Sequence, residues 1–203
     1  MSRRISPGGH RRSVRPAKTA LVSGGLLRVA GLGVLINGDS GIGKSESSLE
    51  LISRGNRLVS DDVVEARRGE DGRILGRSPS LTRHFMEIRG LGIINIKQIF
   101  GPRAVLLESP IALVITLHKW EGRGRSDRLG LKFPEDYTLL GGRIPRINIP
   151  VAPGRNIATL IEIACKVQGL RKSGYHASKD IVRKLERVLS RRGRGGAVPG
   201  EKR

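Results

Sequence analysis

The chain has 203 residues, a formal net charge of +20 and only 3% aromatic residues. This length accommodates one domain of ordinary size with a hydrophobic core. So few rings argue against a base-stacking platform for single-stranded nucleic acid. The single cysteine, Cys165, excludes an intrachain disulfide and a cysteine-cluster metal site. No run of about 18 apolar residues occurs in the sequence, so no membrane span is predicted.

The positive charge is concentrated at the two ends of the chain. Residues 1–19 carry six basic side chains and no acidic one, and residues 171–203 carry 11 basic and three acidic ones, a net +8. We predict a basic disordered head over 1–19, one folded domain over 20–191 and a basic disordered tail over 192–203. Contact of these ends with nucleic acid or another acidic surface is the alternative interpretation, which is possible but not favoured.

The first part of the domain has a strand, loop and helix pattern. Residues 26–36 are apolar and β-branched, which predicts a hairpin or a bent strand that runs into a buried strand at 33–36. A glycine-rich loop follows, and then a helix over 44–54 that ends at Gly55. Residues 58–64 read as a single short strand.

The middle of the chain has weaker signals. Residues 66–82 are polar and rich in glycine, with weak strands at best. Residues 84–99 contain an apolar run that two glycines interrupt. Two apolar runs, 105–107 and 111–117, are joined by a predicted turn at 108–110, and the second run is apolar on both faces, as in a central strand.

The last part predicts an edge strand and two helices. Residues 144–151 alternate in polarity and contain two prolines, which lack a ladder donor, so an edge strand is expected. Residues 156–168 have apolar residues at helical spacing. Residues 178–191 predict a second, amphipathic helix, capped by Ser178. Its apolar residues are expected to face inward; they are Ile181, Val182, Leu185 and Val188.

Residues 38–45 read GDSGIGKS and match the phosphate-binding pattern G-x-x-x-x-G-K-[ST] in full. The glycines allow the loop amides to point at phosphate oxygens, and the following helix adds its N-terminal amides. Lys44 can reach the β- and γ-phosphates, and the Ser45 hydroxyl can ligate Mg²⁺. The pattern therefore predicts a nucleotide site made of Gly38, Asp39, Ser40, Gly41, Ile42, Gly43, Lys44 and Ser45.

Two adjacent carboxylates, Asp61 and Asp62, follow this loop by about one strand. Neighbouring residues of a strand point to opposite faces, so only one of the two is expected to face the γ-phosphate. Paired carboxylates also raise each other's pKa, which suits a general base. The residues alone leave the choice between them open.

Three blocks together resemble the catalytic domain of bacterial HPr kinase/phosphorylase. They read GDSGIGKSESSLELISRGNRLVSDDVV, MEIRGLGIINI and IPVAPGRN. The resemblance covers about residues 23–185. It implies an α/β fold, a P-loop nucleotide-binding domain similar to the nucleotide domain of phosphoenolpyruvate carboxykinase, with a mixed sheet and two C-terminal helices.

The resemblance also implies an activity and partners. Members of this family use ATP and Mg²⁺ to phosphorylate a serine on HPr, a small phosphocarrier of the sugar phosphotransferase system. Many also remove that phosphate with inorganic phosphate and release pyrophosphate. An HPr-like partner, a homo-oligomer that is commonly a hexamer, and a cytoplasmic location without membrane contact are therefore expected.

By the same resemblance, individual residues acquire roles. Lys44 holds the transferring phosphate, Asp62 takes up the serine proton, and Arg128 is the catalytic arginine. Ser45 and Glu87 are the Mg²⁺ ligands, a hydroxyl and a carboxylate of the hard-oxygen type that this ion prefers. Residues 86–95 serve both directions of the reaction, and residues 149–154 are linked to phosphorolysis.

Two positions depart from the family pattern. Ser23 stands where a histidine is usual, and Ala152 stands where an arginine is usual. Both changes remove a group that could be cationic near the phosphates, so they weaken the case for phosphorolysis more than the case for kinase chemistry.

Two other functions remain open from the sequence. One is a P-loop kinase-like protein with another substrate, which the shortened chain and the missing histidine would suit. The other is a nucleotide sensor that binds nucleic acid through its basic ends.

Overall fold

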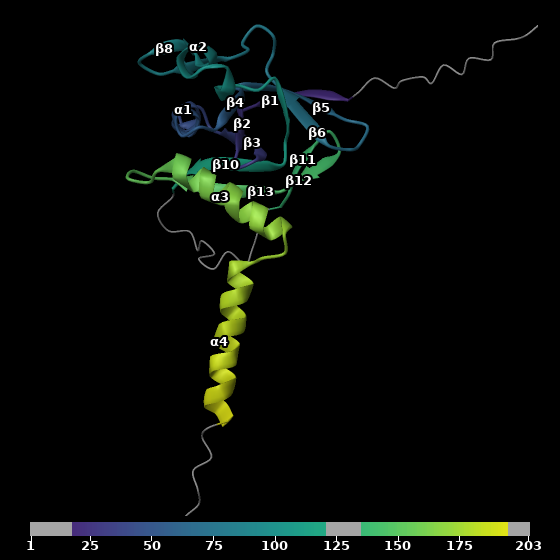
Figure 1. Ribbon diagram of the computed structural model, residues 1–203, viewed down its shortest axis with the longest axis vertical. Coiled ribbons are helices and arrows are strands. Elements are labelled where there is room, and N and C mark those ends of the chain that lie inside the picture. Colours follow the sequence, from purple (N-terminus) through teal and green to yellow (C-terminus); the bar gives the residue numbers. More distant parts are fainter. Residues whose placement is uncertain (1–17, 121–134, 195–203) are drawn as a thin grey trace, which may run out of the picture.

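The computed structural model describes residues 18–120 and 135–194. Its largest sheet has five strands, which lie side by side in the order β13 (Arg146–Val151), β10 (Leu113–Lys119), β3 (Leu32–Gly38), β2 (Gly25–Val29) and β4 (Arg57–Ser60). β13, β10 and β3 run parallel, whereas β2 is antiparallel to both of its neighbours. The sheet is therefore mixed, as predicted (Figure 1).

A second sheet is antiparallel and has four strands, in the order β1 (Thr19–Ser23), β5 (Val63–Arg68), β6 (Ile74–Arg77) and β9 (Glu108–Pro110). Two hairpins accompany the sheets: β7 (Phe85–Ile88) with β8 (Gly92–Asn95), and β11 (Tyr137–Leu139) with β12 (Gly142–Ile144). The helices are α1 (Lys44–Ser53), α2 (Ile96–Phe100), the 3₁₀ turn η1 (Pro102–Ala104), α3 (Ile157–Lys172) and α4 (Ala177–Arg194). In the described part of the chain, no helix has the length and apolar content to cross a bilayer.

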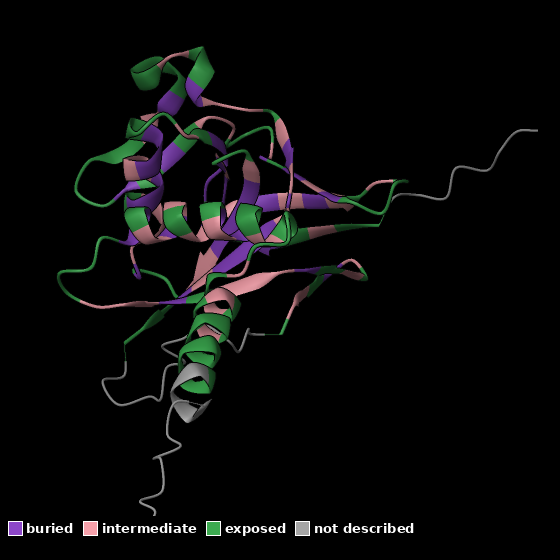
Figure 2. Cartoon of the chain, turned by 60° about the horizontal axis from the view of Figure 1, so that its bottom comes forward, coloured by how far each residue is buried: buried purple, intermediate pink, exposed green. Residues whose placement is uncertain are grey.

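The five-stranded sheet is buried on both faces. On one face Leu27 and Ile115 belong to a core that includes side chains of α1 and α3. On the other face Leu26 and Val114 pack with Val64 of the second sheet. Alternate residues of a strand point to opposite faces, so this two-sided burial explains why β3 and β10 read as continuous apolar runs (Figure 2).

Several predicted elements are confirmed. Residues 26–36 form the β2–β3 hairpin, β13 lies at the edge of its sheet, and both C-terminal helices are present. α1 ends in a Schellman motif, in which the amide of Gly55, at φ +90°, donates to Ile52 O and the amide of Asn56 donates to Leu51 O. The predicted stop at Gly55 thus has its expected geometry.

Two predictions about the strands were wrong. Residues 58–64 are two strands, β4 and β5, which belong to different sheets, and residues 61–62 form the turn between them. Residues 108–110 form the strand β9, which pairs with β6, instead of a turn. In the second case the tertiary partner, which is distant in sequence, overrides the local turn preference of proline and serine.

The prediction for the last helix was also wrong in part. α4 begins one residue before Ser178, and of the four apolar residues predicted to face inward, three are exposed and Val182 is half-buried. Ile181, Leu185 and Val188 are 46%, 54% and 52% exposed, because α4 extends away from both sheets (Figures 1 and 2). α4 also continues to Arg194, three residues into the range assigned to the tail. The head up to residue 17 and the tail from residue 195 lie outside the described residues.

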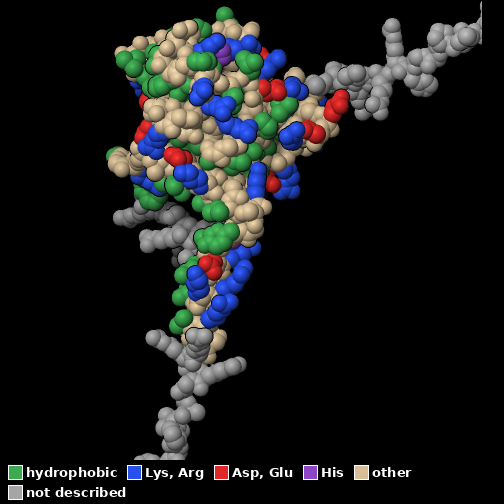
Figure 3. Space-filling model, in the orientation of Figure 1, with side chains coloured by type: hydrophobic (Ala, Val, Ile, Leu, Met, Phe, Trp, Pro, Cys, Tyr) green, Lys and Arg blue, Asp and Glu red, His purple; other side chains and the backbone are tan. Residues whose placement is uncertain are grey.

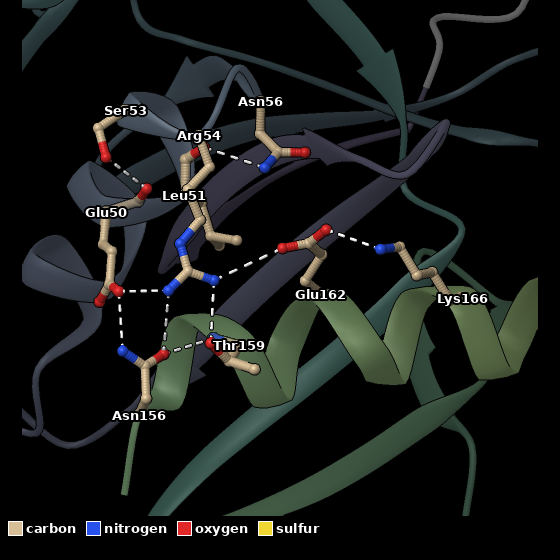
Figure 4. Close-up of polar contacts among 9 residues, drawn as sticks. All are labelled: Glu50, Leu51, Ser53, Arg54, Asn56, Asn156, Thr159, Glu162 and Lys166. Atoms are coloured by element: carbon tan, nitrogen blue, oxygen red, sulfur yellow. Dashed lines mark hydrogen bonds and ion pairs between the residues drawn. The ribbon is translucent and has the colours of Figure 1, made fainter.

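A polar network joins the phosphate-loop helix α1 to α3 (Figure 4). Arg54 donates to Thr159 Oγ1 at 2.9 Å and pairs with Glu50 and Glu162. Asn156 caps α3, since its Oδ1 accepts from the Thr159 amide at 2.7 Å, while its Nδ2 donates to Glu50 at 2.8 Å. Asn156 therefore caps the N-terminus of α3 and also bonds α3 to α1.

We expect Asn156→Ala to lower the free energy of unfolding by about 1–2 kcal/mol, because the variant loses the cap and the bond to α1. Urea denaturation measures the change. The matched control is Asn148→Ala, at an exposed position of β13, which should change the value by less than about 0.5 kcal/mol. Equal effects of the two substitutions would contradict the assigned role.

Candidate active site

The phosphate loop leaves β3 at Gly38 and enters α1 at Lys44. Gly41 and Gly43 have φ values of +75° and +98°, in the left-handed region that favours glycine. Gly43 is the N-cap of α1 and makes no side-chain capping bond, so the first amides of the helix are available to a ligand. The loop thus has the backbone geometry of an anion site at a helix N-terminus.

Lys44 is folded back over this loop. Its Nζ donates to the carbonyl oxygens of Gly38 at 2.9 Å and Asp39 at 2.8 Å. These bonds hold the ammonium group beside the loop amides. A phosphate bound there would meet both the amides and a positive charge.

A cavity of about 230 Å³ lies in front of the loop. Five of the predicted nucleotide-site residues line it, namely Ser40, Gly41, Gly43, Lys44 and Ser45. The other lining residues are Glu46, Asp61, Asp62, Glu87 and Arg89. The structure therefore brings the P-loop, both aspartates and the β7–β8 hairpin to one place.

The two aspartates occupy a tight turn between β4 and β5. Asp62 has φ +65°, and the Val63 amide donates to Asp61 O at 2.8 Å, which is the geometry of a γ-turn centred on Asp62. The Asp62 carbonyl accepts from the Gly24 amide at 2.7 Å. The two side chains differ in exposure: Asp61 is 9% exposed, whereas Asp62 is exposed. The cause is this turn, and not the alternation of side chains along a strand that the sequence predicted.

Asp61 is in contact with the loop serine. Ser45 Oγ lies 3.4 Å from each Asp61 carboxylate oxygen. Burial raises the pKa of Asp61 to about 6, against the effect of a backbone hydrogen bond from Glu87; the nearby charge of Asp62 also raises it. A buried carboxylate of this kind is stabilised in its charged form by a cation at the same place.

The residues present fit a magnesium ion. Among the described residues, no group of three or more His, Cys, Asp or Glu side chains is arranged to hold a metal. Mg²⁺ is commonly held by one or two carboxylates together with phosphate oxygens and water, so Ser45, Asp61 and Glu87 beside a phosphate loop are a suitable donor set.

Arg89 is a site residue that we did not single out from the sequence. It lies two residues after Glu87, in the turn of the β7–β8 hairpin. A Cβ built on Gly41 would lie 3.5 Å from Arg89 Nη2. The guanidinium group of Arg89 thus lies beside the phosphate loop and is the second cation in the cavity lining, after Lys44. In the sequence, the one indication that Arg89 belongs to the site was its place within the MEIRGLGIINI block.

Three further positions that the sequence analysis singled out do not line this cavity in the described part of the chain. Arg128 lies outside the described residues. Ser23 ends β1 opposite Val63, next to the aspartate turn. Ala152 O accepts from the Arg155 amide at 3.2 Å in the loop before α3.

Comparison with known proteins identifies relatives of the chain. The family model described as HPr Serine kinase C-terminal domain matches residues 15–185. The HPr kinase/phosphorylase of Geobacillus thermodenitrificans (strain NG80-2) is 45% identical over 173 residues, which are 85% of this chain and 56% of the relative. That of Bacillus subtilis (strain 168) is 43% identical over 175 residues, 86% of this chain and 56% of the relative. The chain thus spans about half the length of these curated relatives.

A solved structure is similar over most of the chain. It is the Hpr(Ser) kinase/phosphatase from Coxiella burnetii, with 36% sequence identity and a TM-score of 0.71. The match covers 80% of this chain and 98% of that one. The predicted fold class is thereby confirmed.

We expect the raised pKa of Asp61 to appear as a pH-dependent cost to stability. Ionised Asp61 destabilises the folded chain above about pH 6, and this cost vanishes below about pH 4, where the carboxyl group is protonated in both states. Asp61→Asn should therefore raise the free energy of unfolding by about 1–3 kcal/mol at pH 8, and by little at pH 4. Urea denaturation without divalent cations or nucleotide measures both values.

Asp62→Asn is the control for this effect, because the side chain is exposed and asparagine also tolerates a left-handed φ. It should change stability by less than about 0.5 kcal/mol at either pH. If Asp61→Asn were no more stable than the wild type at pH 8, the assigned burial of a charged carboxylate would be wrong.

Proposed function

The chain belongs to the HPr Serine kinase C-terminal domain family, and we propose that it phosphorylates a serine of an HPr-like phosphocarrier protein with ATP and Mg²⁺. The observation that carries this proposal is the single cavity that the P-loop, Asp61, Asp62 and Glu87 share. It combines an anion site, a set of hard oxygen donors and an exposed carboxylate. These are the parts that phosphoryl transfer to a hydroxyl group requires.

The loop and Lys44 are assigned to the nucleotide phosphates. The amides of residues 38–45 bind β- and γ-phosphate oxygens, and Lys44 exchanges its two loop carbonyls for phosphate. Ser45 and Glu87 are the proposed Mg²⁺ ligands, and Asp61 lies next to Ser45. The ion, when bound, neutralises the charge of the transferring group.

Asp62 is the proposed general base. Its carboxylate is exposed in the cavity, where an incoming hydroxyl group can approach it. Asp62 takes the serine proton as the serine oxygen forms a bond to the γ-phosphorus, and the bond from that phosphorus to the bridging oxygen of ADP breaks. Arg89, which lies beside the phosphate loop, is a proposed cation for the charge that develops on the transferred group. Arg128 is proposed for the same role from the family resemblance alone.

Phosphorolysis is the second proposed activity, and we expect it to be the weaker one. It requires inorganic phosphate next to a phosphoserine, and the repulsion between two polyanions must be offset by protein cations. Ser23 and Ala152 supply none. Pyrophosphate release from phospho-HPr at saturating phosphate measures this direction.

We also propose that the chain forms a homo-oligomer, with a hexamer as the expected size from the family resemblance. The exposed apolar residues of α4 are available for contacts between copies. Light scattering of the full chain measures the mass.

The function is tested by transfer of labelled phosphate from ATP to purified HPr in the presence of Mg²⁺. Lys44→Ala is expected to lower kcat by about 100-fold or more, because it removes the ammonium group that the phosphate loop holds for the phosphates. The matched control is Lys166→Ala, an exposed lysine on α3, which should stay within about twofold. If the wild-type chain binds ATP but does not phosphorylate HPr, the proposed substrate is wrong and the P-loop serves a reaction with another one.

The two aspartates are expected to fail in different ways. Asp62→Asn should lower kcat by about 100-fold or more with unchanged ATP affinity, because it removes the proton acceptor. Asp61→Asn should instead raise the Mg²⁺ concentration needed for half-maximal rate, since Asp61 contacts Ser45. The reverse pattern would show that the general base is Asp61.

A further inference from the structure

The strand β1 ends the four-stranded sheet and pairs on one side only, with β5. The ladder continues past both ends of β1, since the Arg68 amide donates to Lys18 O at 3.2 Å and the Gly24 amide donates to Asp62 O at 2.7 Å. In an antiparallel pair, hydrogen-bonded residues alternate with residues whose N–H and C=O point away from the neighbouring strand. The β1 residues that present these groups at the free edge are therefore Thr19, Leu21 and Ser23. Among the described residues, their backbone groups have no other hydrogen-bond partner.

The other end strands of the two larger sheets are protected against further pairing. β9 has only three residues, which include Glu108 and Pro110, and β13 contains Pro150. β4 is covered by the chain after η1, where the Leu106 amide donates to Leu58 O at 2.7 Å. Charges, prolines and covering segments are the usual means of blocking an edge. β1 reads TALVS, without a charge, a proline or a bulge in its ladder, so it can accept a further strand.

The edge of β1 is complementary to a second copy of itself. If two copies pair antiparallel about a two-fold axis at Leu21, this residue is opposite Leu21 of the partner subunit, and Thr19 is opposite the partner's Ser23. All of these residues have edge-facing backbone groups, so the three pairs would exchange about six hydrogen bonds. A register shifted by one residue would instead oppose them with groups that already bond to β5. The centred register is the one that uses all three residues of both copies.

Side chains on the outer face of this edge favour the same contact. Leu21 is 74% exposed, and two opposed leucines would cover apolar surface of each other. The charged residues nearby are already paired, Arg67 with Glu108 at 3.0 Å and Arg77 with Glu65 at 2.8 Å. Figure 3 shows acidic and basic side chains intermixed near the place where the grey head joins the described chain. Two copies of a chain with a net charge of +20 can therefore approach here with little local repulsion.

We propose that two copies of the chain pair through their β1 strands, so that their four-stranded sheets join into one antiparallel sheet across a two-fold axis at Leu21. The proposal names one contact of the homo-oligomer proposed above, and it does not depend on the kinase assignment. A two-fold contact joins only two copies. A hexamer would need a second kind of contact, for which the exposed apolar residues of α4 are available.

The pairing also brings each active site close to the other copy. In the same register Lys18 is opposite the partner's Gly24, whose amide bonds to the carbonyl oxygen of Asp62 in the aspartate turn. Ser23, which stands where a histidine is usual in the family, comes directly before Gly24. One copy would thus place a cation beside the position at which the other has lost a basic side chain.

The test is cross-linking of full chains that carry one introduced cysteine. In the proposed register the two Cα atoms at position 21 are about 5.5 Å apart, whereas the two at position 19 are about 14 Å apart. A bifunctional methanethiosulfonate that bridges only the shorter distance should link Leu21→Cys into a dimer at least tenfold faster than Thr19→Cys. A mixture of Thr19→Cys and Ser23→Cys chains should be linked as efficiently as Leu21→Cys. The natural thiol, Cys165, is buried and should not react.

Leu81→Cys is the matched control, because Leu81 is 88% exposed and lies outside β1, and it should be linked no faster than Thr19→Cys. Leu21→Lys should halve the mass measured by light scattering, since it puts like charges opposite each other, while Leu81→Lys should leave the mass unchanged. Equal cross-linking at positions 19, 21 and 81 would indicate random collisions and overturn the proposal. An unchanged mass of Leu21→Lys would overturn it as well, whether or not the chain phosphorylates HPr.

Discussion

The parallel pairing of β3 with β10 is the contact on which the candidate active site depends. Their register places Gly38 opposite Leu117, and a Cβ at Gly38 would lie 2.5 Å from the Leu117 carbonyl oxygen. Because glycine has no side chain, the two strands can approach closely at the point where the phosphate loop begins, and no larger residue would fit there. The loop joins Gly38 directly to α1, so the position of its amides follows from the core of the sheet.

The site itself has a charge opposite to that of the whole chain. The chain carries +20, yet the described lining of the P-loop cavity has four carboxylates and two cations, a net charge of −2. The carboxylates belong to Glu46, Asp61, Asp62 and Glu87, and the cations to Lys44 and Arg89. Such a lining repels a free polyphosphate and accepts one that is chelated to a divalent cation. Charge balance therefore supports the proposed use of a nucleotide–magnesium complex, on grounds independent of the motif.

The sequence predicted those parts of the structure that are encoded locally. The P-loop, its helix and the stop at Gly55 depend on adjacent residues with special backbone angles, and these were confirmed as elements of the fold. Asp61 and Asp62 were assigned to a strand because valine and leucine surround them, whereas a γ-turn separates two sheets there. β9 was missed because its partner β6 is distant in sequence. The apolar spacing of α4 predicted a helix correctly, but spacing alone does not show whether a partner covers the apolar face.

α3 lies along the five-stranded sheet, from the side of the phosphate-loop helix to the start of α4. Just before its first residue Asn156 bonds to Glu50 of α1, and near its C-terminus Arg171 and Lys172 line a second cavity, of about 320 Å³. Its 16 residues form a rod about 24 Å long. A rigid helix can carry a displacement from one of its ends to the other. It couples events at the two ends only if they favour different arrangements of α3.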